Sequence, residues 1–379
     1  MNSTPKKVLR RAQFASTPDE LEKSIVDSHQ YLDKEIVNGN CPAGELDISI
    51  AYKNSLFLLK EYATLDWQHC NEIAKVMDEI RRYARDPSRK RPLNIILHAE
   101  SGSGKSHFVE CLARAMSEDQ VGEVTFNMSS MRGIEDLMQP LDAVRNLKVR
   151  DKLPLLFLDE FDTDDTKYAL LLPLLWDGKL STGERVLRTG KTVIILAGSK
   201  SDIGNAIQSA KSMKANLDAD GKMIDLVSRI NGGELAIPSL DTSRRTADKI
   251  CVAISLLRER FGRRLTRVPW ALLKFMAITR FRHGVRSISN LIESIANAEL
   301  SKRGALECIA LKLPLDDLSD FGVSNLPMHI VAEDGAQSVV DCWQQCKQCT
   351  SLVKIAESDN AWNRLLEFSA GERARGKKI

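Results

Sequence analysis

The sequence lacks a hydrophobic run long enough to cross a membrane. Its longest apolar stretch near the centre, Tyr168–Trp176, is far shorter than the roughly 20 residues that a spanning helix needs. Four basic residues stand between Lys6 and Arg11, but no apolar segment follows them, which argues against a secretory signal. We therefore expect a cytoplasmic protein with no membrane partner.

A strong excess of one charge is also missing, because the net charge is only +3. A balance this small does not by itself predict binding to nucleic acid. Local basic runs occur at 81–91 (RRYARDPSRKR) and 258–267 (RERFGRRLTR). Solvated linker and helix surfaces explain both runs more simply than a nucleic-acid site does, so nucleic acid is the less favoured partner.

The chain has few cysteines that stand close together. Of its eight cysteines, only Cys342, Cys346 and Cys349 form a cluster, with CxxxCxxC spacing. On a loop this spacing can hold an iron–sulfur cluster, whereas on a helix the three positions share a face with Val339 and Val353. No fourth ligand is visible, so we favour the packed helix face over a metal site. The other cysteines are scattered, most of them in apolar contexts typical of reduced core thiols.

What the sequence does contain is a regular alternation of strands and helices in its centre. Short apolar runs predict parallel strands at 93–98, 123–128, 154–159, 192–198 and 234–238. Helical patterns fill the gaps between them, at 105–117, 133–146, 166–177, 202–216 and 221–229. This order predicts an α/β fold with a three-layer parallel sheet. The flanks read as helical, at 19–36, 53–83, 242–261, 268–280 and 284–302.

The segment Asn94–Ser106, NIILHAESGSGKS, carries the strongest functional signal. A strand, a loop of small residues, Lys-Ser and a helix follow one another, which is the order that a phosphate-binding loop needs. Glycines let backbone N–H groups converge on phosphate oxygens, and the start of the helix adds partial positive charge. The lysine can reach the β and γ phosphates, and the serine hydroxyl can bind Mg²⁺. The predicted loop residues are Ala99, Glu100, Ser101, Gly102, Ser103, Gly104, Lys105, Ser106 and His107.

A second motif, LLFLDE, ends an apolar strand in Asp159 and Glu160. Ligands of parallel sheets bind at the carboxyl ends of the strands, so both carboxylates should face the phosphate loop. We expect Asp159 to hold Mg²⁺ and Glu160 to activate the attacking water. The acidic residues that follow, Asp162, Asp164 and Asp165, fit a solvated loop and helix cap better than a second metal site.

Three further residues could act on the nucleotide, and two of them, Ser199 and Arg229, also have a purely structural reading. Ser199 ends the strand TVIILAGS and either contacts the γ-phosphate or the lytic water, or simply terminates the strand. Arg229, in DLVSRINGGE, is either an arginine finger supplied to a neighbouring subunit or a surface ion pair. Arg286 stands at the start of a helix, where a guanidinium could reach the γ-phosphate and couple the helical region to the nucleotide.

Together these features resemble an AAA+ ATPase and are most similar to the second ATPase module of Clp-type chaperones. LFLDEFD with LLLPLLWDGKLSTGERVLRTGKTVIILAGS resembles the run from Walker B to sensor 1, where a helix, a turn and a hairpin lead into the sensor strand. IDLVSRINGGELAIPSL resembles the arginine-finger box, and HGVRSISNLI resembles sensor 2. The resemblance spans about residues 90–300. It implies Walker A at Lys105 and Ser106, Walker B at Asp159 and Glu160, sensor 1 at Ser199, the finger at Arg229 and sensor 2 at Arg286.

The resemblance also implies ATP and Mg²⁺ as ligands and a ring, usually a hexamer, with ATP at the subunit junctions. Two positions depart from the family pattern. Ser199 stands where Clp-type modules usually have Asn, and the stretch 129–134 (SSMRGI) lacks the aromatic residue of a pore loop. The missing aromatic argues against threading of polypeptide through a pore. Met131 or Arg132 could still line a pore, but a plain loop is the favoured reading of this stretch.

The functional expectation is a ring-forming ATP hydrolase that remodels or regulates a partner protein. The alternatives are a nucleotide-gated switch or assembly platform that controls a separate effector, as in bacterial anti-phage defence, and a nucleic-acid loader. The flanks hold no nucleophile-elbow context, so any effector chemistry should come from another chain. The expected domains are a helical N-terminal region with a basic linker (1–90), a nucleotide-binding domain (91–240), a helical lid (241–325) and a C-terminal helical tail (326–379).

Overall fold

A computed structural model describes part of the chain. The described residues are 45–47, 57–59, 62–116, 121–183, 185–199, 225–240, 246–262, 265, 267–269, 273, 276–277, 281 and 283–294. They fall into two compact units. The larger unit runs from Gln68 to Pro238, and the smaller unit holds the described residues up to Trp67 and from Ser239 onward.

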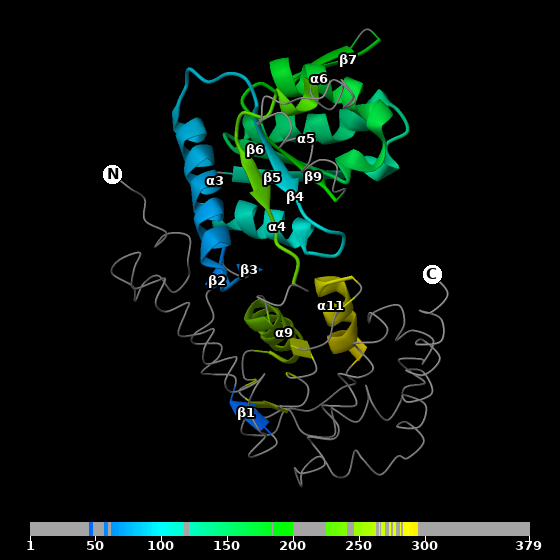
Figure 1. The fold of residues 1–379 in the computed structure, drawn as a ribbon. Helices are drawn as coiled ribbons and strands as arrows, with labels where there is room; N and C mark the ends of the chain where they lie inside the picture. The colour runs from blue at the N-terminus through cyan, green and yellow to red at the C-terminus, as the bar shows by residue number, and fades with distance from the viewer. Residues whose placement is uncertain are drawn as a thin grey trace, which may run out of the picture. The chain divides into compact units, whose positions relative to one another are not determined.

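The larger unit is built on a five-stranded parallel sheet. Its strands are β4 (Leu93–His98), β5 (Val121–Asn127), β6 (Leu153–Asp159), β9 (Val193–Gly198) and β10 (Glu234–Ala236). They lie in the order β10-β4-β9-β6-β5, and every neighbouring pair is parallel (Figure 1). All five predicted strands are confirmed. The prediction succeeds because short apolar runs between helices are typical of buried parallel strands.

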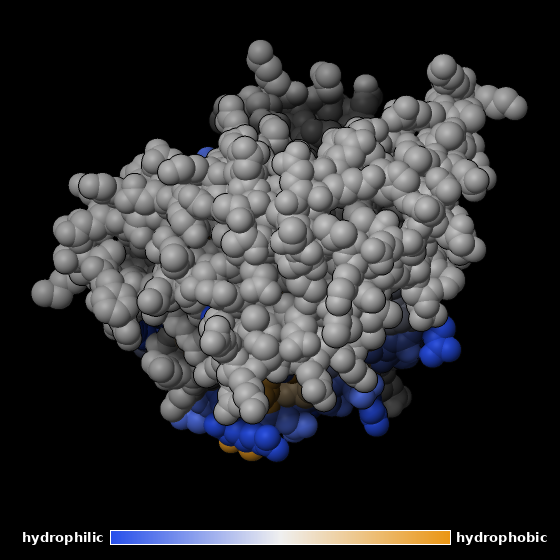
Figure 2. All heavy atoms as spheres, turned by 90° about the horizontal axis from the view of Figure 1, so that it is seen from below, coloured by the Kyte–Doolittle hydropathy of each residue, from blue (hydrophilic) through white to orange (hydrophobic). Residues whose placement is uncertain are grey.

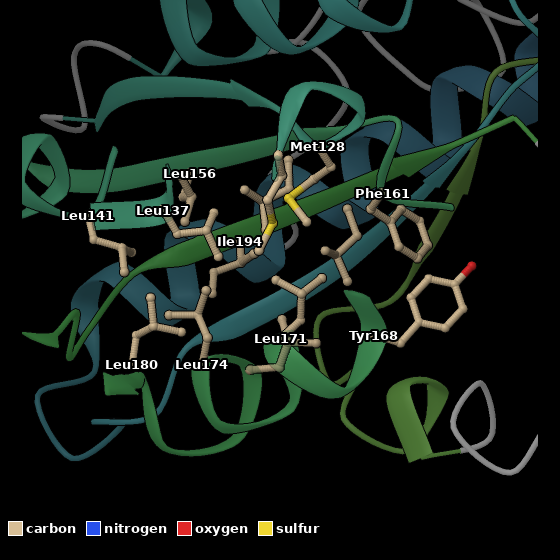
Figure 3. Packing of buried hydrophobic residues seen from close by; sticks show 14 of the residues in the cluster. Met128, Leu137, Leu141, Leu156, Phe161, Tyr168, Leu171, Leu174, Leu180 and Ile194 are labelled. Carbon is tan, nitrogen blue, oxygen red and sulfur yellow. The ribbon is translucent and has the colours of Figure 1, made fainter. Parts of the chain in front are cut away.

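Helices cover both faces of the sheet. The helices of the larger unit are α3 (Trp67–Arg85), α4 (Lys105–Ala115), α5 (Met138–Val149) and α6 (Tyr168–Asp177). Side chains alternate along β6, so Leu156 and Leu158 join the core cluster with α5 and α6, while Phe157 is buried on the other face. Figure 3 shows Leu171 and Leu174 of α6 pointing toward the strand residues of this cluster. The fold is therefore the expected α/β three-layer parallel sheet.

Short elements connect these layers. Single 3-10 turns lie at Met128–Ser130, Ile134–Leu137, Phe161–Thr163 and Asp165–Lys167. The predicted helix at 133–146 thus starts as a 3-10 turn and continues as α5. An antiparallel hairpin of β7 (Lys179–Thr182) and β8 (Arg185–Arg188) leads into β9. The hairpin confirms the helix, turn and hairpin order that the family resemblance implies.

The helix predicted across 53–83 begins only at Trp67. A hairpin of β2 (Phe57–Leu58) and β3 (Tyr62–Ala63) takes the place of its first turns. The Thr64 hydroxyl accepts the N–H of Asp66 and donates to the buried carboxylate of Asp248, each at 3.1 Å. Local side-chain hydrogen bonds of this kind compete with helix formation, and Asp248 is a partner that local periodicity does not reveal.

The smaller unit contains α9 (Thr246–Phe261), α11 (Val285–Ser294) and a strand pair of β1 (Glu45–Asp47) with β11 (Arg267–Pro269). Strand β11 corrects the start of the helix predicted at 268–280, because pairing with β1 holds this segment extended. Arg260 of α9 forms a 2.9 Å ion pair with Glu293 of α11. The predicted helices at 19–36 and 202–216 and the cysteine cluster 342–349 lie outside the described residues.

On the face drawn in Figure 2, the described side chains that are visible are mainly hydrophilic, with small hydrophobic areas among them. Within the described ranges no helix is both long and apolar enough to cross a bilayer. The described cysteines Cys70, Cys111 and Cys251 are buried and form no disulfide, as expected of reduced core thiols.

Candidate functional site

The loop between β4 and α4 has the backbone of a phosphate cradle. Gly102 and Gly104 adopt φ values of 80° and 90°, a region that side chains rarely enter. Gly104 is the N-cap of α4, and its carbonyl accepts the Phe108 N–H at 2.9 Å, so the helix starts directly behind the loop. The first N–H groups of the helix consequently point toward the loop interior.

Lys105 lies inside the loop rather than on its surface. Lys105 is only 8% exposed. Its ammonium donates to the carbonyls of Ala99 at 3.2 Å and Glu100 at 3.4 Å. An ammonium group has three donors, so this arrangement can also serve an acceptor in the loop interior.

Ser103 supplies a second polar group inside the loop. Its Oγ is buried and has no hydrogen-bond partner among the described residues. Buried hydroxyls are normally paired, so an orphaned one inside a cradle fits a loop built for a ligand oxygen. Of the other loop residues, Ala99 is buried, while Glu100, Ser101 and His107 are exposed.

Ser106 and Asp159 meet at the mouth of the loop. The Ser106 hydroxyl donates to Oδ2 of Asp159 at 3.1 Å, across 53 residues of sequence. Asp159 is the last residue of β6, and Asn127 at the end of β5 stands opposite it in the register. A hydroxyl and a carboxylate oxygen this close are the hard oxygen donors that Mg²⁺ prefers. The structure thus brings Ser106 and Asp159 together, and their role as Mg²⁺ ligands stays a prediction.

Glu160 occupies a strained backbone position beside this pair. Its φ and ψ are 54° and 37°, in the left-handed region that costs a non-glycine residue roughly 1–2 kcal/mol. The Glu160 N–H donates to Oδ1 of Asp159 at 3.0 Å, and its carbonyl accepts the Thr163 hydroxyl at 2.8 Å. These bonds hold the turn, and strain of this kind concentrates at functional sites.

Asp162 is a site residue that sequence reasoning missed. It was expected in a solvated loop, yet it is 1% exposed, and its Oδ2 accepts the backbone N–H of Ser199 at 2.8 Å. The partners are 37 residues apart in sequence, so no local signal reveals the contact. The expectation of a cap does hold for Asp164, whose Oδ1 accepts the Thr166 N–H at 3.0 Å.

The strand order explains why Ser199 belongs to this group. Strand β9 lies between β4, which leads into the loop, and β6, which ends in Asp159. The Ala99 N–H donates to the carbonyl of Gly198 at 3.2 Å, which ties the start of the loop to the end of β9. Ser199 follows Gly198, so its backbone stands between the phosphate loop and the acidic pair.

Arg229 is not part of this group in its own chain. The Asn94 side chain donates to the Arg229 carbonyl at 2.8 Å, and Asn94 is the second residue of β4. The loop follows His98, four residues on, and a strand rises about 3.3 Å per residue, so the two places lie roughly 13 Å apart along the strand. The Arg229 guanidinium donates to the Asp225 carbonyl and lies 3.5 Å from the Ser228 hydroxyl.

Two other predicted features can be placed only within their own units. Arg286 is exposed near the start of α11 in the smaller unit. In the larger unit, Met131 is buried in the core cluster, so it does not line a pore. Arg132 beside it is 91% exposed in its side chain and lies 3.6 Å from Asp136. This segment reads as the plain loop that the sequence favours.

No protein-family model matches the chain, and no curated protein matches it. Solved structures match it at low identity. Hsp104 of S. cerevisiae in complex with ADP is 13% identical with a TM-score of 0.34, over 66% of this chain and 42% of that one. ORC2 of Aeropyrum pernix with ADPNP and ADP is 14% identical with a TM-score of 0.44, over 64% of this chain and 66% of that one. NtrX of Brucella abortus in complex with ATP is 15% identical with a TM-score of 0.40, over 59% of this chain and 48% of that one.

Proposed function

We propose that the chain is an ATP hydrolase of the AAA+ type that binds ATP with Mg²⁺ and acts on a partner protein. The observation that carries the proposal is the 3.1 Å contact between Ser106 and Asp159 at the mouth of a loop that holds Lys105. A chance glycine-rich turn before a helix has no reason to bring a strand-end carboxylate to the residue after its lysine.

Each residue then has one task in phosphoryl transfer. Backbone N–H groups of the loop other than that of Ser103, which donates to the Glu100 carbonyl, bind phosphate oxygens together with the Ser103 hydroxyl, and Lys105 neutralises their charge. Ser106 and Asp159 hold Mg²⁺, which offsets the negative charge that develops on the phosphates. Glu160 orients and deprotonates the attacking water, and Ser199 contacts the γ-phosphate or this water.

Hydrolysis should need a second copy of the chain. Arg229 lies at the opposite edge of the sheet from its own loop, so its guanidinium can complete only the site of a neighbour. A ring, with a hexamer as the expected form, gives every site such a neighbour. Arg286 and the helical lid around it would report the nucleotide state, which makes them the natural link to a partner protein.

The buried position of Met131 favours a second candidate function within this class. A threading motor needs side chains that grip polypeptide in the pore, and the exposed residues of the described segment 128–137 are Ser129, Ser130, Arg132 and Glu135, none of them aromatic. A nucleotide-gated switch or platform that controls a separate effector needs no such grip. Of these two functions, we favour the nucleotide-gated switch or platform over a motor that threads polypeptide.

Purified protein tests the proposal directly. Lys105→Ala should abolish ATP binding, because the cradle loses its cation, while Glu160→Gln should bind ATP but hydrolyse it at least about 100-fold more slowly. Glu135→Gln, a change of the same kind outside the site, is the control and should retain turnover. Phosphate release and nucleotide binding are the measurements. Normal turnover by Glu160→Gln would refute the role of Glu160, and ATP binding by Lys105→Ala would refute the site.

A further inference from the structure

Besides Arg229, the edge of the sheet opposite the phosphate loop carries basic residues to which the proposed nucleotide chemistry gives no role. Three neighbouring strands start at this edge, since Leu93 of β4 pairs with Val193 of β9, and Val193 with Leu155 of β6. Adjacent strands lie about 4.8 Å apart, so β4 and β6 are separated by about 10 Å. Basic residues in the segments that lead into these strands therefore act on one small area.

The segment before β4 provides two cations and an aromatic neighbour. Lys90 and Arg91 are exposed, and neither takes part in an ion pair within the described ranges. The guanidinium of Arg91 lies over the ring of Trp176, 4.2 Å from its centroid. Trp176 is the penultimate residue of α6, and 48% of its surface is exposed, which is unusual for so large a side chain. Arg89 contributes less, because Glu79 pairs with it at 2.7 Å.

The segments before β6 and β9 extend the same area. Arg150 and Lys152 are exposed and belong to no ion pair among the residues that the structure describes. Lys191 donates to the carbonyls of Ala84 at 3.0 Å and Asp86 at 2.6 Å, which ties the start of β9 to the end of α3. Figure 1 shows the loop from α3 to β4, α6 and the β7–β8 hairpin together at the top of the view.

We propose that this basic edge, formed by Lys90, Arg91, Arg150, Lys152 and Trp176, binds single-stranded nucleic acid. Four exposed cations spread over about 10 Å can neutralise about three phosphates of a single strand that crosses them. An exposed indole beside them offers a stacking surface for an unpaired base, as single-strand binding proteins do. An acidic protein segment would pair with the cations of this edge, but it has no base to stack on the indole of Trp176. The inference does not depend on the nucleotide site, which opens at the other edge of the sheet.

Fluorescence anisotropy with labelled oligo-dT and oligo-U of about 20 nucleotides tests the proposal on the full chain. Binding should weaken with salt, with a slope of log K against log salt of roughly −2 for three phosphates. The double variant Lys90→Ala, Lys152→Ala should bind about tenfold more weakly, and its salt slope should be less negative by about 1.4. The control Lys75→Ala, Arg132→Ala removes the same charge from exposed positions elsewhere and should leave both values unchanged.

Trp176 separates stacking from charge. Trp176→Ala should weaken binding about tenfold without changing the salt slope, and Trp176→Phe, which keeps a ring, should restore most of the affinity. Three results would overturn the proposal: no binding of either strand at low salt, equally tight binding of a duplex of the same length, or equal competition by polyglutamate. A changed oligomeric state of the Lys90, Lys152 variant with unchanged affinity would instead assign this edge to contacts between copies, which also refutes it.

Discussion

The backbone N–H of Ser199 donates a 2.8 Å hydrogen bond to Oδ2 of Asp162, and this bond joins the ends of β9 and β6. Asp162 follows Glu160 by two residues within the turn that holds the proposed catalytic carboxylate. A buried carboxylate accepts such a bond about twice as strongly as a neutral oxygen does. The position of Glu160 and that of Ser199 are therefore set by one shared contact.

Asp162→Asn should lower kcat about tenfold with little change in KM for ATP. The amide is the same size but a weaker acceptor, so the turn holds Glu160 less firmly in its catalytic position. The phosphate loop is unaffected. Asp164→Asn is the matched control, because asparagine still caps the following turn. Steady-state kinetics give the result. An equal loss in the control, or a change in KM alone, would show that Asp162 does not position the catalytic group.

Glu160→Gly should abolish turnover without loss of stability. Glycine adopts the left-handed backbone freely, which offsets its greater entropy in the unfolded chain, so the free energy of unfolding should stay equal or rise by about 1 kcal/mol. Thermal unfolding and phosphate release together make the measurement. Clear destabilisation would mean that the backbone of Glu160 is not under strain in solution, and Asp164→Gly provides the comparison at a position without positive φ.

Arg229→Ala should keep ATP affinity and lose hydrolysis, because the guanidinium serves the site of a neighbour. Mixing it with Lys105→Ala should restore part of the activity. In a mixed assembly, an Arg229→Ala subunit supplies an intact phosphate loop and its Lys105→Ala neighbour supplies an intact Arg229. Neither variant alone contains both. Activity against mixing ratio is the readout. A flat curve at zero would argue that Arg229 does not act across a subunit junction.

Tyr83 should make stability sensitive to alkaline pH. Burial raises the pKa of its phenol from 10.0 to about 12, against smaller opposing effects of the Thr192 backbone and the Arg89 charge. Its hydroxyl also accepts the Thr192 N–H at 2.8 Å. Because the folded pKa is the higher one, the stabilisation is complete below pH 10 and is lost as pH rises toward 12, by up to about 2–3 kcal/mol.

Chemical unfolding of wild type and Tyr83→Phe between pH 8 and 12 tests this. The Phe variant should be less stable at pH 8 by about 1–2 kcal/mol, since the Thr192 N–H loses its partner, but should fall less steeply with pH. Other tyrosines and lysines titrate in both proteins, so the difference between the two curves is the measured quantity. Parallel curves would contradict the raised pKa of Tyr83.

The parts of the fold that sequence predicted are those with local signals. Apolar runs of five to seven residues predict the strands, and the prediction of the contiguous loop 99–107 needs no information from elsewhere in the chain. The contact between Ser106 and Asp159 was also within reach, because both stand where ligands of parallel sheets bind.

The parts that sequence missed depend on distant partners. The carboxylate of Asp248 holds Thr64 extended where periodicity predicted a helix, and pairing with β1 does the same for β11. Asp162 was assigned to solvent because its partner stands in another strand. The distance between Arg229 and its own loop follows from the bond to Asn94, which local patterns do not contain.

The position of Lys105 has a consequence for the thermodynamics of ligand capture. Its ammonium already bridges the first two carbonyls of the loop, so the loop is braced by the group that would attract a phosphate. Capture then uses the third N–H of this ammonium and does not have to order a flexible segment, so little conformational entropy is lost. Calorimetry of such a site should show a small heat-capacity change, as expected for a rigid receptacle rather than for folding coupled to association.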